Sequence, residues 1–168
     1  MNRHDLFLKW LSYALATFLL AILQTLLFNR LCLLHTHPFV LPIMAAMAVI
    51  MEPIYEGFSY AMALGFLCDL TISGAFPCFY TVSFLLLAIL CTWIARKLIV
   101  PGFWCAMVCG TLSIAVCDLI YTMAFHYQHA TPYYDALRLM GREIFLSVPL
   151  IPLVYLLFHQ INLRSRRD

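Results

Sequence analysis

The sequence has few charged residues and almost no extended polar segment. Of its 168 residues, 11% are Asp, Glu, Lys or Arg and 64% are apolar, whereas soluble domains usually carry about 25% charged residues. A water-soluble fold cannot bury so much apolar surface, so the scarcity of charge excludes an independent soluble domain. Because a membrane span needs about 20 apolar residues, the length accommodates about six spans with short connections.

The sequence also lacks the patterns of several kinds of site. There is no Cys-x-x-Cys pair among its seven cysteines, and most of them lie inside apolar runs, where a thiol packs as a small apolar group. Cys105 and Cys109 share a helix face, but packing explains them better than a metal or redox role. The basic residues are scattered and the net charge is only +2, which does not provide a surface that follows nucleic-acid phosphates. We therefore expect no cofactor, no metal and no nucleic-acid partner.

The sequence does contain a series of apolar runs separated by Gly, Pro and charged residues. This pattern predicts an all-α polytopic membrane protein, a single integral membrane domain over residues 1–168 whose spans form one bundle in the lipid bilayer. The first run follows Arg3 and Lys9 and exceeds a signal-peptide core of about 7–15 residues, so it is predicted to be a retained span. The spans are predicted near residues 8–28, 38–54, 57–74, 78–95, 101–125 and 143–162.

Two stretches are less regular. Pro38, Pro42 and Pro53 lie at the ends of the second predicted span or in its first turn, so the path of this span is left open. Residues 126–142 form the one long polar connection, and its tyrosines and arginines suit the lipid head-group zone. We expect this connection to be a loop along the membrane surface.

The distribution of basic residues predicts the orientation, because cytoplasmic loops are enriched in Lys and Arg. One side of the predicted bundle carries Arg3, Lys9, Arg96, Lys97, Arg164, Arg166 and Arg167. The other side carries only Arg30, Arg138 and Arg142. Both termini are therefore predicted to be cytoplasmic.

Gly57, Ala61, Gly65 and Asp69 recur every four residues in the third predicted span. Residues four apart share a helix face, so they form a ridge of small side chains that ends in a carboxyl group. This ridge is the best candidate for helix packing or for a partner interface. A charged group inside a span costs about 3 kcal/mol or more unless it faces protein or water, so Asp69 is expected to have a partner or a cavity.

Two further polar residues lie within predicted spans. Asp118 ends a similar face in the fifth span, where Cys-Asp-Leu at 117–119 repeats residues 68–70, and Gln24 interrupts an apolar run in the first. Gln24 is expected to hydrogen-bond across to another helix. For Asp69 and Asp118, a structural hydrogen bond between helices is the simplest interpretation, and proton or substrate coupling and an intermolecular contact are the alternatives.

The remaining ionisable residues form no catalytic pattern. Glu52 and Glu56 lie four residues apart across the turn at Pro53, and paired carboxylates can serve acid–base catalysis, but no nucleophile or phosphate loop accompanies them. We interpret them as a solvated cytoplasmic turn or a partner contact. Four histidines lie in the predicted outer loops, without an acidic or cysteine ligand that would favour zinc. They are His35, His37, His126 and His129.

Residues 41–76 resemble the family of the rod shape-determining protein MreD. Their sequence is LPIMAAMAVIMEPIYEGFSYAMALGFLCDLTISGAF, and Gln24 followed by residues 26–28 also resembles the end of the first span in that family. One departure is Pro38-Phe39, where many members carry Pro-Asp. The apolar second span closes at Glu52, and the matching positions after it are Gly57, Gly65, Phe66, Asp69, Leu70 and Gly74.

The resemblance implies a non-enzymatic scaffold in the bacterial cytoplasmic membrane. Members of the family partner MreC and help to link the actin-like MreB filament to peptidoglycan synthases, and so control cell shape. Gly57, Gly65 and Asp69 would then shape a helix-packing surface, with Asp69 held by a hydrogen bond that sets the helix register. That surface would face either the MreC-like partner or the protein's own bundle.

Two other classes are alternatives on the sequence alone. A substrate-binding membrane subunit of an energy-coupling-factor vitamin transporter has a similar size, and Asp69 and Asp118 would then line its pocket. Such pockets need several converging polar groups, and the predicted spans contain few. An intramembrane enzyme needs a nucleophile with a base at membrane depth, and no serine or threonine in the spans has an intramembrane histidine beside it.

Overall fold

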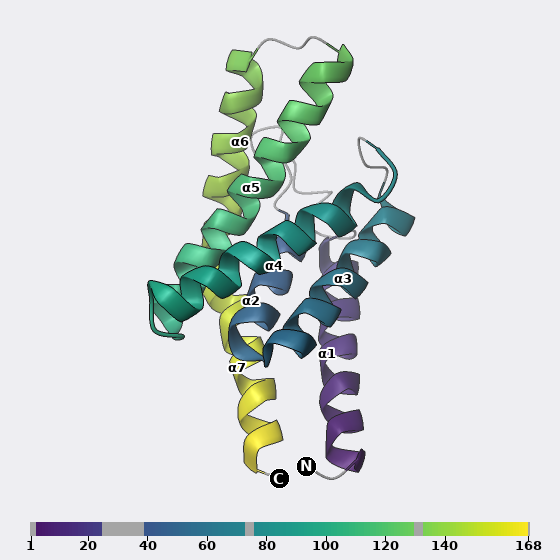
Figure 1. The fold of residues 1–168 in the computed structure, drawn as a ribbon, viewed down its shortest axis with the longest axis vertical. Coiled ribbons are helices and arrows are strands. Elements are labelled where there is room, and N and C mark those ends of the chain that lie inside the picture. Colours follow the sequence, from purple (N-terminus) through teal and green to yellow (C-terminus); the bar gives the residue numbers. More distant parts are fainter. Residues whose placement is uncertain (1–2, 25–38, 73–75, 130–132, 168) are drawn as a thin grey trace.

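The computed structural model describes residues 3–24, 39–72, 76–129 and 133–167. All regular structure in these ranges is helical, which confirms the predicted all-α class (Figure 1). In chain order, the elements are α1 (Arg3–Leu23), α2 (Leu41–Met51), α3 (Ile54–Thr71), α4 (Phe79–Lys97), α5 (Phe103–His129), α6 (Tyr133–Ser147), the short 3₁₀ helix η2 (Val148–Leu150) and α7 (Ile151–Arg167).

Helix α2 is the central helix of the bundle. It contacts α3, α4, α5 and α7, and every residue from Leu41 to Val49 is buried. This position follows from its sequence, because a helix that is hydrophobic all round is buried on all sides. Pro42 lies in the first turn, where a missing N–H costs no intrahelical hydrogen bond. The prolines therefore shorten the second predicted span without breaking the helix.

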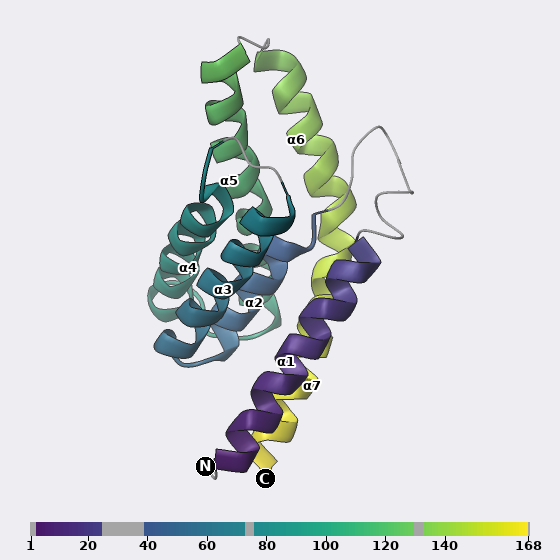
Figure 2. The same cartoon turned by 90° about the vertical axis from the view of Figure 1, so that its right-hand side faces the viewer.

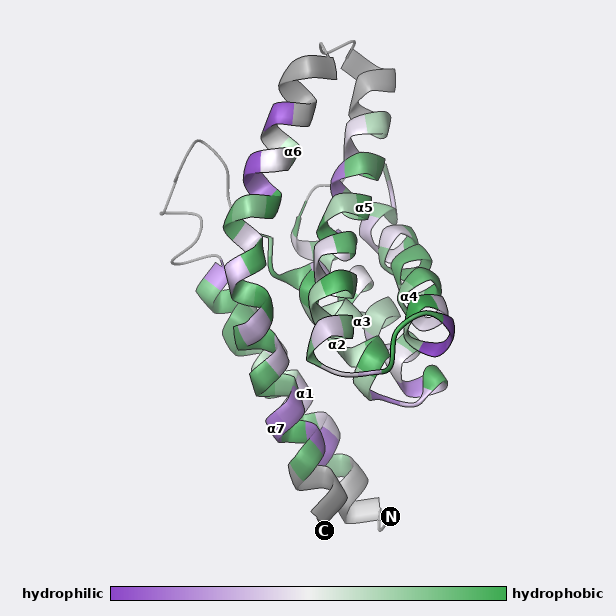
Figure 3. Cartoon of the chain, turned by 90° about the vertical axis from the view of Figure 1, so that its left-hand side faces the viewer, coloured by the Kyte–Doolittle hydropathy of each residue, from purple (hydrophilic) through white to green (hydrophobic). Residues whose placement is uncertain are grey.

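Helices α3 and α4 form the most extensive helix pair of the bundle. The inward face of α3 carries its small residues, and its outward face carries large apolar side chains, among them Phe66 and Leu70. Figure 3 shows that most residues of the helices are apolar and that polar residues lie on α6, near the turns and on parts of α1 and α7. An outward surface of this kind suits lipid rather than water.

The long helices extend from this core at both ends. Helices α1 and α7 lie side by side, and the start of α1 and the end of α7 lie at the same end of the molecule (Figures 1 and 2). The end of α5 and the start of α6 project at the opposite end (Figure 1). Helix α6 leads through η2 into α7, and Pro149 and Pro152 lie at this junction.

Three segments of the described chain are long and apolar enough to cross a membrane. They are Phe79–Lys97, Phe103–Ala124 and Met140–Leu163. Two shorter helical segments, Phe7–Leu23 and Leu41–Met51, are also apolar. Their length and apolar composition indicate a membrane protein, because a helix exposed to water would carry polar residues on its outer face.

The predicted loop over residues 126–142 is wrong. Helix α5 continues to His129 and α6 begins at Tyr133, so most of this segment is a helical hairpin. Its polarity suggested a loop, but a polar, amphipathic helix is equally compatible with such a composition. The pair Thr131-Pro132 is a typical signal for a helix start, and the sixth predicted span accordingly combines the end of α6, η2 and α7.

Candidate functional site

The Asp69 carboxylate joins α3 to the start of α4. One oxygen accepts a hydrogen bond from the backbone N–H of Tyr80 at 2.8 Å. The other accepts from the backbone N–H of Thr81 at 3.0 Å and from the Thr81 hydroxyl at 2.6 Å. The first N–H groups of a helix have no intrahelical partner and carry partial positive charge. A carboxylate from a neighbouring helix therefore caps α4 and neutralises this charge.

Asp69 lies closer to the end of its helix than the sequence predicted. Asp69 lies in the last turn of a helix that ends at Thr71, not well inside a span. The sequence placed it deeper because the apolar residues continue after Thr71, while the helix does not. The cost of removing this carboxylate from water is offset by three hydrogen-bond donors at one helix start.

The small residues of α3 allow close contact with helices of the same bundle. A Cβ atom added at Gly57 would lie 2.8 Å from the Val49 Cα on α2. A Cβ added at Gly65 would lie 2.7 Å from the Thr81 Cα on α4. Ala61, between them, is fully buried. Gly57, Ala61, Gly65 and Asp69 thus pack against α2 and α4, and Gly74 lies outside the described residues.

Replacing Asp69 with asparagine should destabilise the protein by about 1–2 kcal/mol, the usual cost of losing a helix cap and its charge. Asparagine keeps one acceptor oxygen but turns an NH₂ group toward N–H donors. Thermal unfolding in mild detergent measures the change. The matched control is Asp118→Asn, which should cause a smaller loss because Asp118 Oδ2 has no hydrogen-bond partner among the described residues. Equal losses in both variants would contradict the capping role.

A second polar cluster joins three parts of the chain. Glu52, at the turn between α2 and α3, forms an ion pair with Lys9 of α1. The Glu52 carboxylate also accepts hydrogen bonds from the Tyr13 hydroxyl at 2.7 Å and from the Asn162 amide of α7 at 3.2 Å. Lys9 pairs in addition with Glu56 at 2.8 Å. The cluster thereby holds α1 and α7 against the turn that begins α3.

The expectation that Glu52 lies in a solvated turn is wrong. Its side chain is only 3% exposed and that of Lys9 is 7% exposed, whereas Glu56 is 31% exposed. Sequence reasoning treated Lys9 as a topology signal and missed it as a partner. The available signal was a lone lysine at the start of an apolar run, because a cation in such a place needs a carboxylate. The partner itself is 43 residues away and was not predictable from spacing.

The other polar positions differ in how well they are satisfied. Gln24 Oε1 accepts a hydrogen bond from the Val40 N–H at 3.2 Å, so it connects the end of α1 to the start of α2, as expected for a polar group in an apolar run. Asp118 Oδ2 is buried without a hydrogen-bond partner among the described residues, so the structural hydrogen bond predicted for Asp118 stays a prediction. Of the two Cys-Asp-Leu segments, only the first has an aspartate with hydrogen bonds to another helix among the described residues.

The described residues contain no group of three or more His, Cys, Asp or Glu side chains that could hold a metal ion. Cys105 and Cys109 are buried, and their sulfur atoms lie 4.0 Å apart, about twice the length of a disulfide bond. Their setting is that of packed thiols. The side chains of His35, His37, His126 and His129 lie outside the described part of the chain.

Comparisons with known proteins identify no relative. No family model matches the chain, and no curated protein or solved structure does so either. The functional argument therefore rests on the residues and contacts of this chain.

Proposed function

We propose that this chain is a non-enzymatic membrane scaffold of the bacterial cell-elongation machinery, similar to MreD and bound to an MreC-like protein. The observation that supports this proposal is that the segment resembling the MreD family forms close helix contacts within the bundle. Gly57, Gly65 and Asp69 connect α3 to α2 and α4 by close backbone contact and by a helix cap. These residues hold helices together and take part in no catalytic arrangement among the described residues, which suits a scaffold.

The proposed topology has six spans in the cell membrane and both termini in the cytoplasm. Helices α1, α3, α4 and α5 would each supply one span, and the end of α6 with α7 would supply the sixth. The second would contain α2, whose 11 residues are fewer than the roughly 20 that a full crossing needs. An even number of spans agrees with the start of α1 and the end of α7 lying at one end (Figure 2). Two basic residues, Lys9 and Arg96, lie near each other, since Glu52 pairs with Lys9 and lines the same pocket as Arg96. Positive charge of this kind is typical of the cytoplasmic side.

The partners would be an MreC-like protein and, through it, an MreB-like filament and peptidoglycan synthases. The surfaces left for such partners are the outward faces of the helices, because the small-residue face of α3 is occupied within the bundle. Exposed large side chains on α1, such as Phe7, Leu11, Leu15 and Phe18, form one such face. A single-span partner helix would pack there in place of lipid.

The contacts of Asp69 do not favour the alternative function, that of a vitamin-transporter subunit. That function would need Asp69 to face a ligand, whereas both of its oxygens accept hydrogen bonds from α4. Asp118 has the partly buried Glu143 near it, but two carboxyl groups are fewer than the several polar groups that pockets for small polar molecules bring together.

The test is a pull-down of the tagged chain from mildly solubilised membranes of its host, with mass spectrometry of the proteins that co-purify. Recovery of an MreC-like protein or a peptidoglycan synthase is the expected result. Recovery of paired ATPases with a coupling subunit would instead identify a transporter component.

In cells that depend on this chain, Asp69→Leu should disturb rod shape more than Glu56→Gln, because Asp69 caps a helix and Glu56 is partly exposed. Equal tolerance of both changes would argue against the role given to Asp69.

A further inference from the structure

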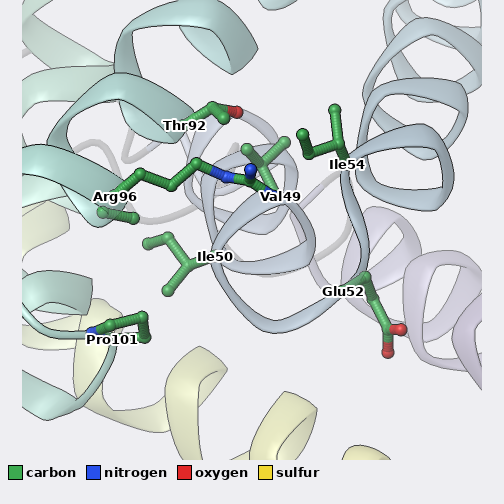
Figure 4. A pocket seen from close by; sticks show the side chains of 8 residues that line it. Val49, Ile50, Glu52, Ile54, Thr92, Arg96 and Pro101 are labelled. Carbon is green, nitrogen blue, oxygen red and sulfur yellow. The ribbon is translucent and has the colours of Figure 1, made fainter.

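A pocket of about 240 Å³ lies at the end of α2, beside the end of α4. Figure 4 shows the side chains that surround it. Its wall exposes polar and apolar surface in about equal parts and comes from α2, the start of α3, α4 and the segment after α4. The lining residues are Val49, Ile50, Glu52, Ile54, Thr92, Ala95, Arg96 and Pro101.

The two charged residues of this pocket, Arg96 and Glu52, differ in whether they have a partner. The Arg96 side chain extends across it toward Val49 (Figure 4), and among the described residues no ion pair of Arg96 is found. The Glu52 carboxylate is instead directed away from Arg96 (Figure 4), toward Lys9 and Tyr13. The only acidic residue among the lining residues is therefore already paired with Lys9, and Arg96 is a lining cation that has no ion pair among the described residues.

The surroundings place this pocket at the level of the lipid head groups. Trp93, next to the lining residue Thr92, is 52% exposed, and Trp104, at the start of α5, is 77% exposed. Exposed tryptophans of membrane proteins are enriched at the boundary between lipid and water. Lys97 follows Arg96 and is also exposed, but it is not one of the residues that line the pocket.

We propose that this pocket binds the head group of an anionic phospholipid, with the phosphate on the Arg96 guanidinium. A guanidinium matches the oxygens of a phosphate by two parallel hydrogen bonds. Ile50, Ile54 and Pro101 would contact the glycerol backbone and the first carbons of an acyl chain. The Thr92 hydroxyl donates to the Ala88 carbonyl, which leaves its oxygen as an acceptor for a head-group hydroxyl. The site requires a membrane but no protein partner. In the proposed topology it lies in the cytoplasmic leaflet, and only this placement rests on the proposed function.

The experiment uses the purified full chain in mild detergent, with phosphatidylglycerol, phosphatidylcholine or glycerol 3-phosphate added at matched concentrations. Native mass spectrometry counts the retained lipid, and thermal unfolding reports stabilisation. Phosphatidylglycerol should be retained and should raise the Tm, whereas the zwitterionic lipid and the soluble head-group phosphate should not. Arg96→Gln should weaken retention about fivefold, the effect of one charge beside an anionic lipid.

The matched control is Lys97→Gln, which removes the same charge from the neighbouring residue outside the pocket and should keep retention near that of the native chain. Arg96→Lys preserves the charge and should keep the preference for phosphatidylglycerol, which separates loss of the cation from loss of the fold. Equal weakening by Arg96→Gln and Lys97→Gln would overturn the proposal in favour of a diffuse surface charge. Equal stabilisation by phosphatidylcholine, or by glycerol 3-phosphate alone, would overturn it as well. The pull-down result has no bearing on these outcomes, so the two proposals fail separately.

Discussion

Replacing Gly65 with alanine should lower the melting temperature by about 6 °C in mild detergent, as expected for an overpacking cost of about 2 kcal/mol in a chain of this size. The added Cβ would meet the Thr81 Cα at 2.7 Å and the Tyr80 carbonyl oxygen at 2.9 Å. Both are backbone atoms and cannot rotate away, so α3 and α4 must separate. Separation would also lengthen the hydrogen bonds from the α4 start to Asp69. Gly65→Leu should cost more than Gly65→Ala, because the larger side chain forces the helices further apart.

The control for this prediction is Gly141→Ala on α6. A Cβ at Gly141 would meet nothing within 4 Å, and alanine favours a helix interior by about 1 kcal/mol over glycine. Gly141→Ala should therefore leave the melting temperature unchanged or raise it slightly. The close contact of α3 and α4 would be disproved if the two variants unfolded at the same temperature.

Replacing Lys9 with methionine should destabilise the chain by about 3 kcal/mol or more, the usual cost of leaving a buried partner charge unpaired. The change leaves the Glu52 carboxylate, 3% exposed, without its cation, and it also releases Glu56. Only the neutral donors Tyr13 and Asn162 then remain on Glu52. Thermal unfolding should show the largest single loss among the polar substitutions considered for this protein.

A double-mutant cycle distinguishes a specific ion pair from a general need for positive charge. Lys9→Met combined with Glu52→Gln should cost less than the sum of the two single changes by about 1 kcal/mol or more, as for residues in direct contact. Lys97→Gln removes an exposed cation and should be close to neutral. Additive losses in the cycle, or a loss at Lys97 as large as at Lys9, would refute the buried pair.

These two contacts have a shared consequence for a scaffold. The Gly65 contact holds α3 against α4, and the Lys9–Glu52 pair holds α1 and α7 against the α2–α3 turn. The bundle is thus fixed at one end by packing and a helix cap and at the other by an ion pair. Such a body can present a constant outward surface to a partner in the membrane, which is what the proposed function requires.

Much of the helical pattern was predictable from hydropathy. The fourth span was predicted near 78–95, and α4 covers Phe79–Lys97, because an apolar run is bounded there by turn residues and by two cations. The 126–142 segment was mispredicted for the opposite reason. Its polar residues belong to helices that project beyond the apolar core, where polarity no longer separates helix from loop (Figure 1).

The candidate site divides in the same way. The α3 ridge was predictable because four residues at helical spacing share a face whatever the rest of the fold is. The Lys9–Glu52 pair and the Asn162 contact were not, since their partners are 43 and 110 residues apart. Asp118 was predicted to be satisfied, yet its Oδ2 lacks a partner among the described residues.

By itself, the sequence determined that this chain is an all-α membrane protein with small residues and a carboxyl group on one face of its third helix, because composition and helical period are local properties. Only the tertiary structure decided that this face packs on α2 and α4, that Asp69 caps a helix start, and that Glu52 is buried against Lys9. Those outcomes depend on which helices become neighbours. Helix adjacency is set by the packing of the whole bundle, to which every span contributes at once.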